Sequence, residues 1–452
     1  MLRTESGGMG MVRTPVIFIN LDRTGMTISS LQKRLSMILP KYSMGIGDRF
    51  AHQGKAQLAA FIKAKSLGVE IAPVWNKSNR EHTIVHSEPV SVREEADNAV
   101  KALGWKGAYF VDADHIGLKT VDKFIGPSDF FTIDVADFIG KPADDSAIAA
   151  FVSAHKPYAT ALRIPGIEGA LDITPARIEA IARKYLFAVQ EAGKVYRHIE
   201  TAKGKGNFAP EVSMDETDQP QTPVDLLFIL AAVAQEKIPV QTIAPKFTGR
   251  FNKGVEYVGN VVQFEKEFND DLAVIAFAVK EFGLPSNLKL SVHSGSDKFS
   301  IYPAIHRAIR RTDAGLHLKT AGTTWLEELI GLASAGGEGM QIAKEVYAQA
   351  LGRFDELCGP YATVIDIDKT KLPTSQVVAG WTGDQYANAL RHDQGNPQYN
   401  MHFRQLLHVG FKVAAQMGER YTDALKKFES VVAKNVTENM FDRHVKRVFL
   451  DP

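Results

Sequence analysis

A dense group of reactive side chains follows an apolar run near residue 290. Residues 288–292 have the pattern of a buried strand, and His293, Asp297 and Lys298 come soon after it, with Gly295 giving the backbone freedom to turn. In parallel α/β proteins, active-site residues lie at the carboxyl ends of the strands. A polar loop with one hydrogen-bonded histidine is the other interpretation of this stretch, and on these residues alone both stay open.

Other apolar runs end in the same way. Residues that carry chemistry near these strand ends are Asp112, Asp114, His115, Asp134, Asp137, Glu211, Asp215, Glu216, His293 and His317. A carboxylate beside an imidazole, as in Asp114 and His115, suits a metal site or an acid/base pair. Oxygen and imidazole ligands without thiolate suit Mn, Co, Ni or Zn, and the sequence does not choose among these metals.

Each of these residues also has a simpler explanation. An Asp or Glu after a strand often caps the next helix, which is the interpretation we favour for Asp137, Asp215 and Glu216. Helix caps do not explain two histidines and an inward-facing Glu211 at the ends of three separate strands. The residues together therefore indicate a functional site, and the lysines and arginines on the same loops are either solvated or bind its ligand.

The elements that must position this site alternate along the chain. We expect strands at residues 14–20, 69–74, 107–111, 130–134, 159–164, 209–214, 240–243, 288–292 and 315–318, and a glycine-flexed loop at 45–50. We expect helices at 28–39, 55–65, 92–103, 175–191, 223–236, 261–282 and 303–311. Apolar strands separated by helices indicate a parallel sheet covered on both sides. There are enough units to close a barrel, so we predict an α/β fold, a TIM-like (β/α) barrel, in preference to an open sheet.

From about residue 324 helical patterns dominate, at 340–357, 398–417 and 421–434, around an irregular stretch at 359–387. We predict a disordered tail at residues 1–12, a barrel catalytic domain at 13–323 and a C-terminal helical extension packed on the barrel at 324–452.

Composition limits the classes of function. The 452 residues carry a formal net charge of +1, which argues against a nucleic-acid or membrane-surface partner. The single cysteine, Cys358, leaves no internal disulfide and fits a cytoplasmic protein. No apolar run is long enough for a membrane span. The glycine-rich motifs of NAD and ATP sites are absent, and so are H-E-x-x-H and G-x-S-x-G.

Seven motifs resemble those of the tagaturonate epimerase family, in the same order along the chain. They are GIGDR at 45–49, DADH at 112–115, FTID at 131–134, EVSMDET at 211–217, HSGSDKFSIYP at 293–303, HLKTAGT at 317–323 and RQLLH at 404–408. Members of this family interconvert D-tagaturonate and D-fructuronate in hexuronate catabolism with a divalent metal, and relatives epimerise tagatose and fructose at C4. The resemblance departs from the family at Phe138, where a further histidine is expected.

The resemblance implies a role for several residues. It makes Asp114 the proton acceptor and Glu211 the proton donor, makes His115 and His293 metal ligands, and leaves His317 a ligand of the metal or of a substrate hydroxyl. We expect the substrate, a sugar or sugar acid, to be bound by Asp48, Arg49, Lys253, Asp297, Lys298 and Lys319. Lys253 or Lys298 would pair with a uronate carboxylate, and His408 would reach the site from the C-terminal helices. A homo-oligomer is compatible with this interpretation of the site.

The sequence is compatible with three functions. The first is the epimerase. The second is a metal-dependent aldolase or isomerase on a related ketose or uronate, which would release fragments or move the carbonyl. The third is a non-catalytic sugar-binding barrel, which the joint presence of Asp114, Glu211, His115 and His293 argues against, because binding alone needs no acid/base pair.

Overall fold

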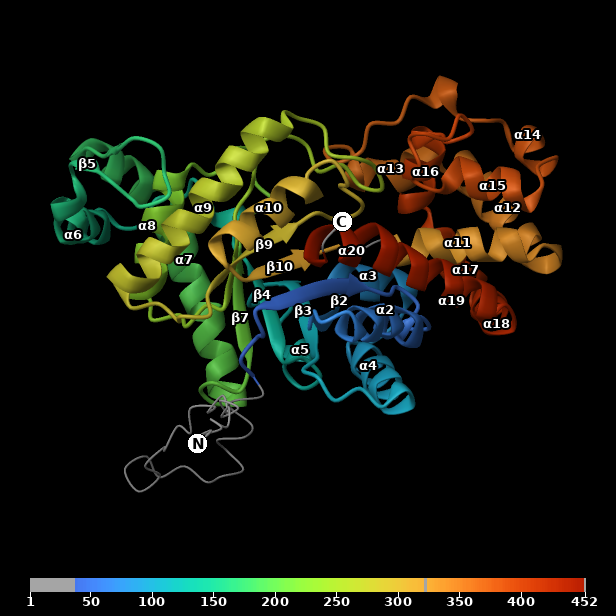
Figure 1. Ribbon diagram of the computed structural model, residues 1–452, viewed down its shortest axis with the longest axis horizontal. Helices are drawn as coiled ribbons and strands as arrows, with labels where there is room; N and C mark the ends of the chain where they lie inside the picture. The colour runs from blue at the N-terminus through green and yellow to red at the C-terminus, as the bar shows by residue number, and fades with distance from the viewer. Residues whose placement is uncertain (1–36, 321–322, 451–452) are drawn as a thin grey trace, which may run out of the picture.

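The computed structural model describes residues 37–320 and 323–450, and within them a closed parallel barrel of eight strands is the central element (Figure 1). The strands are β1 (Tyr42–Gly47), β2 (Ala72–Ser78), β3 (Phe110–Ile116), β4 (Phe130–Asp134), β7 (Ala209–Ser213), β8 (Thr242–Ala244), β9 (Lys289–His293) and β10 (Leu316–Lys319). They pair in the order β1-β10-β9-β8-β7-β4-β3-β2. The predicted TIM-like barrel is confirmed.

Helices cover the outside of the barrel. They are α2 (Gly54–Ser66), α3 (Asn79–Val85), α4 (Val90–Leu103), α5 (Asp122–Ile125), α6 (Asp145–His155), α7 (Pro175–Lys203), α8 (Pro223–Gln235), α9 (Val261–Phe282) and α10 (Tyr302–Thr312), with short turns η2 (Ala136–Phe138) and η3 (Lys156–Tyr158). Local sequence sets several of their starts: the side chain of Thr222 caps α8 before Pro223, and Asn260 caps α9.

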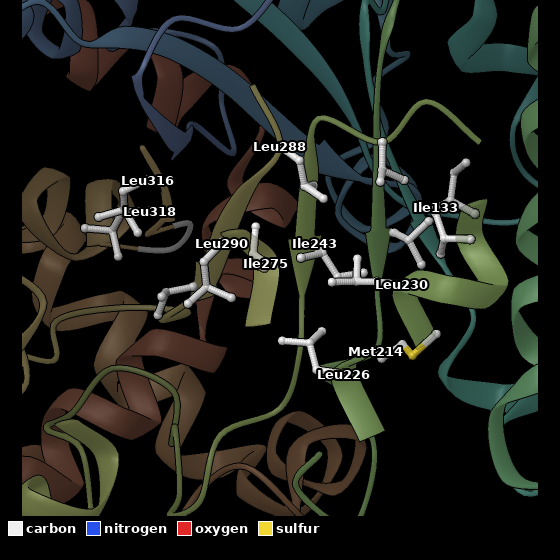
Figure 2. Close-up of a cluster of buried hydrophobic side chains, with 14 of the residues drawn as sticks. Ile133, Met214, Leu226, Leu230, Ile243, Ile275, Leu288, Leu290, Leu316 and Leu318 are labelled. Atoms are coloured by element: carbon white, nitrogen blue, oxygen red, sulfur yellow. The ribbon is translucent and has the colours of Figure 1, made fainter. Parts of the chain in front are cut away.

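The outward faces of the strands and the inward faces of these helices form the main apolar core. Figure 2 shows side chains of the strands, such as Ile243 and Leu290, lying against Leu226 and Leu230 of α8 and Ile275 of α9. Burying such aliphatic side chains is the main favourable term in folding. The polar residues of the strand ends are thereby left to the inside and to the carboxyl end of the barrel.

The barrel differs from the predicted elements in two places. Residues 45–47, expected in a loop, form the end of β1, because Gly45 and Gly47 pair with β2. Residues 159–164, expected as a strand of the sheet, supply only β5 (Ala161–Leu162), which pairs antiparallel with β6 (Leu171–Asp172) outside the barrel. These residues are largely exposed, so they lack the burial of a parallel strand. The expected tail at 1–12, the strand at 14–20 and most of the helix at 28–39 lie outside the described residues.

The chain after β10 is helical. It contains α11 (Thr323–Ala335), α12 (Gly337–Gly352), α13 (Phe354–Cys358), α14 (Ser375–Ala379), α15 (Gly383–Leu390), α16 (Met401–Val409), α17 (Phe411–Met417), α18 (Glu419–Lys427), α19 (Glu429–Glu438) and α20 (Lys446–Phe449). Short turns η4 (Gly359–Tyr361) and η5 (Lys369–Lys371) and the π-helical turn η6 (Asn439–Val445) complete it. Most of these helices surround a second apolar core, whereas Phe441, Val445 and Phe449 return to the core of the barrel. The domain boundary near residue 324 stays a prediction.

Within the described ranges, no helix combines the length and apolar character needed to cross a membrane.

Candidate active site at the carboxyl end of the barrel

A cavity of about 800 Å³ opens at the carboxyl end of the barrel. Each of the eight strands contributes a side chain to its wall, at the end of the strand or in the loop after it: Arg49, Ser78, Asp114, Asp134, Asp215, Pro245, His293 and Lys319. The helical extension closes another part of the wall with Tyr361, Val364, His408 and Phe411. The cavity is therefore where the strand-end residues of the sequence converge, as expected for this fold.

Two histidines and a carboxylate face one another in the cavity. His115, Asp215 and His293 present ligand atoms that lie within 4.8 Å of one another. Nδ1 of His293 lies 3.1 Å from Oδ1 of Asp215 but makes no hydrogen bond, and the two imidazole rings are 5.3 Å apart. Asp134 and Glu216 form a second such group with His115. Imidazole and carboxylate atoms converging in this way form a donor set that divalent metals bind.

The local shape of β3 brings Asp114 and His115 into the same cavity. Neighbouring residues of a regular strand point to opposite faces, so these two side chains should diverge. The pairing of β3 with β4 shifts register between Ala113 and Ile116, and His115 takes a positive φ of 50°. Such bulges re-aim a side chain, which explains how adjacent residues serve one site.

Carboxylates also bond a ring nitrogen of each histidine. Oε1 of Glu211 lies 2.8 Å from Nε2 of His293, and Oδ2 of Asp134 lies 2.9 Å from Nδ1 of His115. Carboxylates commonly orient metal-binding histidines through the second ring nitrogen. Glu211 is fully buried and does not line the cavity, so it lies where it can orient His293, and its role as a proton donor stays a prediction.

Negative charge around the two histidines raises their pKa values. Burial alone would lower the pKa of His115, but Asp114 and Asp134 raise it to about 10. Burial likewise opposes the charged form of His293, and Asp215 and Glu211 raise its pKa to about 9. When the two histidines are neutral, they do not balance the negative charge of the surrounding carboxylates. This excess of negative charge is a suitable environment for a cation.

Lys319 from β10 ties two aspartates of β3 together. Its ammonium pairs with Asp112 at 3.0 Å and with Asp114, and donates to Oγ1 of Thr132 at 2.8 Å. Burial raises the pKa of Asp112, with help from Asp114 and Glu211, to about 6. Burial acts on Asp114 too, but Lys319 and His115 outweigh it, so the pKa of Asp114 falls below its ordinary value. Asp114 is therefore an ionised carboxylate at the cavity wall.

His317 belongs to neither metal-binding group. Its Nδ1 lies 2.9 Å from Oγ of Ser43, its ring lies against Phe130, and burial lowers its pKa to about 3. His317 is thus a neutral histidine inside the barrel, two residues before Lys319 on the same face of β10.

The expected substrate-binding residues fall into two sets. Arg49, Lys253 and Lys319 line the cavity. Asp48 does not, because its two carboxylate oxygens accept the backbone N–H groups of residues 50–53 at 2.6–3.1 Å and so hold the turn before α2. Arg49 stands in the wall against Glu81, at 3.2 Å, and over the ring of Phe411.

Asp297 and Lys298 lie outside the cavity. Asp297 is fully buried, forms an ion pair with Arg404 at 2.9 Å and hydrogen bonds with His444 at 3.1 Å and His392 at 3.2 Å. Lys298 is also buried, donates to Oγ of Ser296 at 2.8 Å, and burial lowers its pKa to about 7. Asp297 thus joins the loop after β9 to the helical extension, and substrate binding by either residue stays a prediction.

Replacing Asp297 with alanine is expected to lower the free energy of unfolding by about 3–5 kcal/mol, because Arg404 would be left charged and unpaired in the interior. Chemical denaturation followed by circular dichroism measures this loss. Asp423→Ala, which removes an exposed partner of Lys426 on α18, is the matched control and should cost about 0–1 kcal/mol. Equal effects of the two substitutions would contradict the structural role of Asp297.

Sequence reasoning missed two residues of the site. The sequence favours helix caps for Asp215 and Glu216, whereas both line the cavity and approach His115. Their position directly after β7, inside the EVSMDET motif, was the available signal. His408, expected to reach the site from the C-terminal helices, does line the cavity.

Comparisons with known proteins agree with this picture. The tagaturonate epimerase family matches residues 19–448. A tagaturonate/fructuronate epimerase of Thermotoga maritima is 25% identical over 455 residues, which cover 95% of this chain and 86% of that protein.

Solved structures show the same fold. The native crystal structure of fructuronate-tagaturonate epimerase from Cohnella laeviribosi is 21% identical with a TM-score of 0.72, and covers 91% of this chain and 83% of its own. The form with two glycerol molecules is 22% identical with a TM-score of 0.74, and covers 94% and 86%. The resemblance drawn from the motifs is confirmed by the family match over most of the chain. This chain therefore belongs to the tagaturonate epimerase family and is an epimerase, an enzyme of the isomerase class.

Proposed function

We propose that this enzyme interconverts D-tagaturonate and D-fructuronate with the help of a divalent cation at the carboxyl end of the barrel. The observation that carries the proposal is the convergence of His115, Asp215 and His293 beside the ionised Asp114 in one cavity. The family match and the Thermotoga maritima relative, named for this reaction, support the choice of substrate.

The residues fit a metal ion. Nδ1 of His293 is buried, lies 3.1 Å from a carboxylate oxygen of Asp215 and has no hydrogen-bond partner, so two lone-pair donors face the same point. Glu211 holds the other nitrogen of that ring. Mn, Co, Ni or Zn bound by His115, Asp215 and His293 would supply Lewis-acid polarisation of the carbonyl and hydroxyl oxygens of the sugar.

The reaction explains why a carboxylate must stand next to this site. The carbon to be inverted lies beta to the ketone, so simple enolisation does not reach its C–H bond. Removal of its hydroxyl proton allows the adjacent carbon–carbon bond to break, giving an aldehyde and an enediolate. The aldehyde then rotates, and the bond re-forms on its other face as the proton is returned. Deprotonation at carbon needs a much stronger base than a carboxylate, so we rank it second.

We assign the transfer of that hydroxyl proton to Asp114. Its carboxylate is kept ionised by Lys319 and lines the cavity, as a general base requires. The ammonium of Lys319 also offsets negative charge that develops on the sugar oxygens. Glu216, in the loop after β7, lines the same cavity from another strand and is the carboxyl group available to the opposite side of the substrate.

The proposed function is tested by NMR of the protein with fructuronate in D2O. Tagaturonate should appear without deuterium at the inverted carbon, because the carbon–hydrogen bond is not broken. Free fragments would identify an aldolase, and a moved carbonyl would identify a ketose–aldose type isomerase. Deuterium at the inverted carbon would show that the enzyme works by proton transfer at carbon and not by cleavage of the carbon–carbon bond.

Lys253 is expected to bind the carboxylate of the uronate. Lys253→Met should raise KM for fructuronate about tenfold while kcat changes little, because a charged hydrogen bond made equally in ground and transition states is lost. Steady-state kinetics with fructuronate and with neutral fructose measure the contrast, and fructose kinetics should not change. Lys412→Met, an exposed lysine on α17, is the control. An unchanged KM for fructuronate would remove Lys253 from the carboxylate site.

A further inference from the structure

The backbone of the loop that carries Lys253 is held mainly by the helical extension. The N–H of Lys253 donates to the carbonyl of Val364 at 2.8 Å, and its own carbonyl accepts from Nε2 of Gln405 at 3.3 Å. The carbonyl of Gly254 accepts from Nε of Arg404 at 2.5 Å. Three of the four backbone hydrogen-bonding groups of these two residues therefore have partners that follow the barrel in the chain.

The fourth group connects the loop to the segment after β9. The N–H of Gly254 donates to Oγ of Ser296 at 3.0 Å, and the same oxygen accepts from Lys298. Gly254 has a positive φ of 77°, and a Cβ there would lie 3.1 Å from His408, one helical turn beyond Arg404. Only glycine fits this conformation and this contact without strain. The loop is thus held by the helical extension, including α16, on one side and by the segment after β9 on the other.

Arg404 is the centre of this arrangement. Its side chain is fully buried, and each guanidinium nitrogen has a partner: Gly254 through Nε, the carbonyl of Leu390 through Nη1 at 2.7 Å, and Asp297 through Nη2 at 2.9 Å. A guanidinium presents its donors in a rigid fork, so these three bonds fix the position of Gly254 relative to Asp297. A lysine offers a single, mobile ammonium and cannot make all three.

The backbone contacts leave the side chain of Lys253 directed at the site. Lys253 lines the cavity together with Gly295, and its Nζ lies 3.7 Å from the position that a Cβ of Gly295 would occupy. We propose that Arg404 is a positioning residue that sets the ammonium of Lys253 for the substrate carboxylate, so that the helical extension is part of the active site. This inference rests on the proposed function.

A double-mutant cycle tests it. Arg404→Lys should raise KM for fructuronate about tenfold, with kcat within about threefold of the unchanged enzyme, because a charged hydrogen bond that orders Lys253 is lost. In the Lys253→Met background the same substitution should change KM by less than about twofold, since no ammonium remains to be positioned. Arg391→Lys, which alters an arginine bound to Asn435 in the same extension, should leave both constants unchanged.

Additive effects in the cycle, or a loss confined to kcat and thermal stability, would show that Arg404 is merely structural and would overturn the inference. An unchanged KM in Lys253→Met would also overturn it, because Arg404 would have nothing to position. In both cases turnover of fructuronate by the unaltered enzyme would still support the proposed function. Absence of that turnover would instead reject the proposed function itself.

If Arg404→Lys does not fold, Gln405→Leu decides the question. This variant removes the bond to the carbonyl of Lys253 and leaves the Arg404–Asp297 pair intact. A KM for fructuronate raised several-fold, with no further rise in the Lys253→Met background, supports the inference. A KM equal to that of the unaltered enzyme overturns it.

Discussion

Asp114→Asn is expected to lower kcat for fructuronate by about 10²–10⁴-fold, because the cavity then lacks the carboxylate that accepts the hydroxyl proton. Asparagine keeps the shape of the side chain but cannot take a proton. Lys319 retains Asp112 as a partner at 3.0 Å, so its buried charge stays balanced and the fold should persist. Single-turnover and steady-state rates measure the loss, and circular dichroism checks the fold.

The matched control is Asp137→Asn, which changes an exposed carboxylate just beyond β4 that does not line the cavity. It should have the activity of the unaltered enzyme. The pairing of Asp114 with Lys319 makes a second comparison possible: Lys319→Met should also lower kcat, since it removes the charge that keeps Asp114 ionised. Full turnover by Asp114→Asn would assign proton transfer to another group.

The barrel could be predicted because its strands contain runs of buried apolar residues and its helices carry clear boundary signals. The strand Phe130–Asp134 and the helix Val261–Phe282 have the predicted bounds. The first begins with four buried residues before a charge, and the second lies between the Asn260 cap and Gly283 in the left-handed conformation. At residues 159–164, where the local pattern predicts a strand of the sheet, the deciding factor is tertiary burial, which a local pattern does not contain.

The site could be predicted only as a set of strand ends. Asp114, His115, His293 and Lys319 converge because parallel strands of a barrel end at one face. The orientation of His115 depends on the bulge between β3 and β4, which a single strand does not reveal. The sequence therefore predicts which residues belong to this group, but it does not predict how their side chains are arranged.

Asp297 shows what the strand-end pattern does not contain. It lies in the same polar loop as His293 and looks equally exposed in the sequence, yet its partners Arg404, His392 and His444 come from 95 to 147 residues further along the chain. Pairings over such distances are set by how the extension packs on the barrel. A charged residue near a strand end is thus evidence for a site only when no residue distant in the chain forms an ion pair or hydrogen bond with it.

His293→Ala is expected to remove most of the bound divalent metal and to lower turnover about a thousandfold or more, because Lewis-acid assistance contributes several kcal/mol to such a step. The imidazole contributes the Nδ1 that faces Asp215 at 3.1 Å without a hydrogen bond. Inductively coupled plasma mass spectrometry of the purified protein measures metal content independently of activity. Treatment of the unaltered enzyme with a chelator should abolish turnover, and addition of Mn, Co, Ni or Zn should restore it.

Glu211→Gln distinguishes orientation of His293 from direct proton donation. Because Glu211 is buried behind the ring and bonded to Nε2 at 2.8 Å, its amide variant should weaken metal affinity about 10–100-fold. Its turnover should recover substantially when metal is added in excess, whereas that of His293→Ala should not. A Glu211→Gln enzyme that binds metal normally but stays inactive would instead mean that Glu211 reaches the substrate as a proton donor. Unchanged metal content in His293→Ala would remove the imidazole from the ligands, and a fully chelated enzyme at normal turnover would reject the metal altogether.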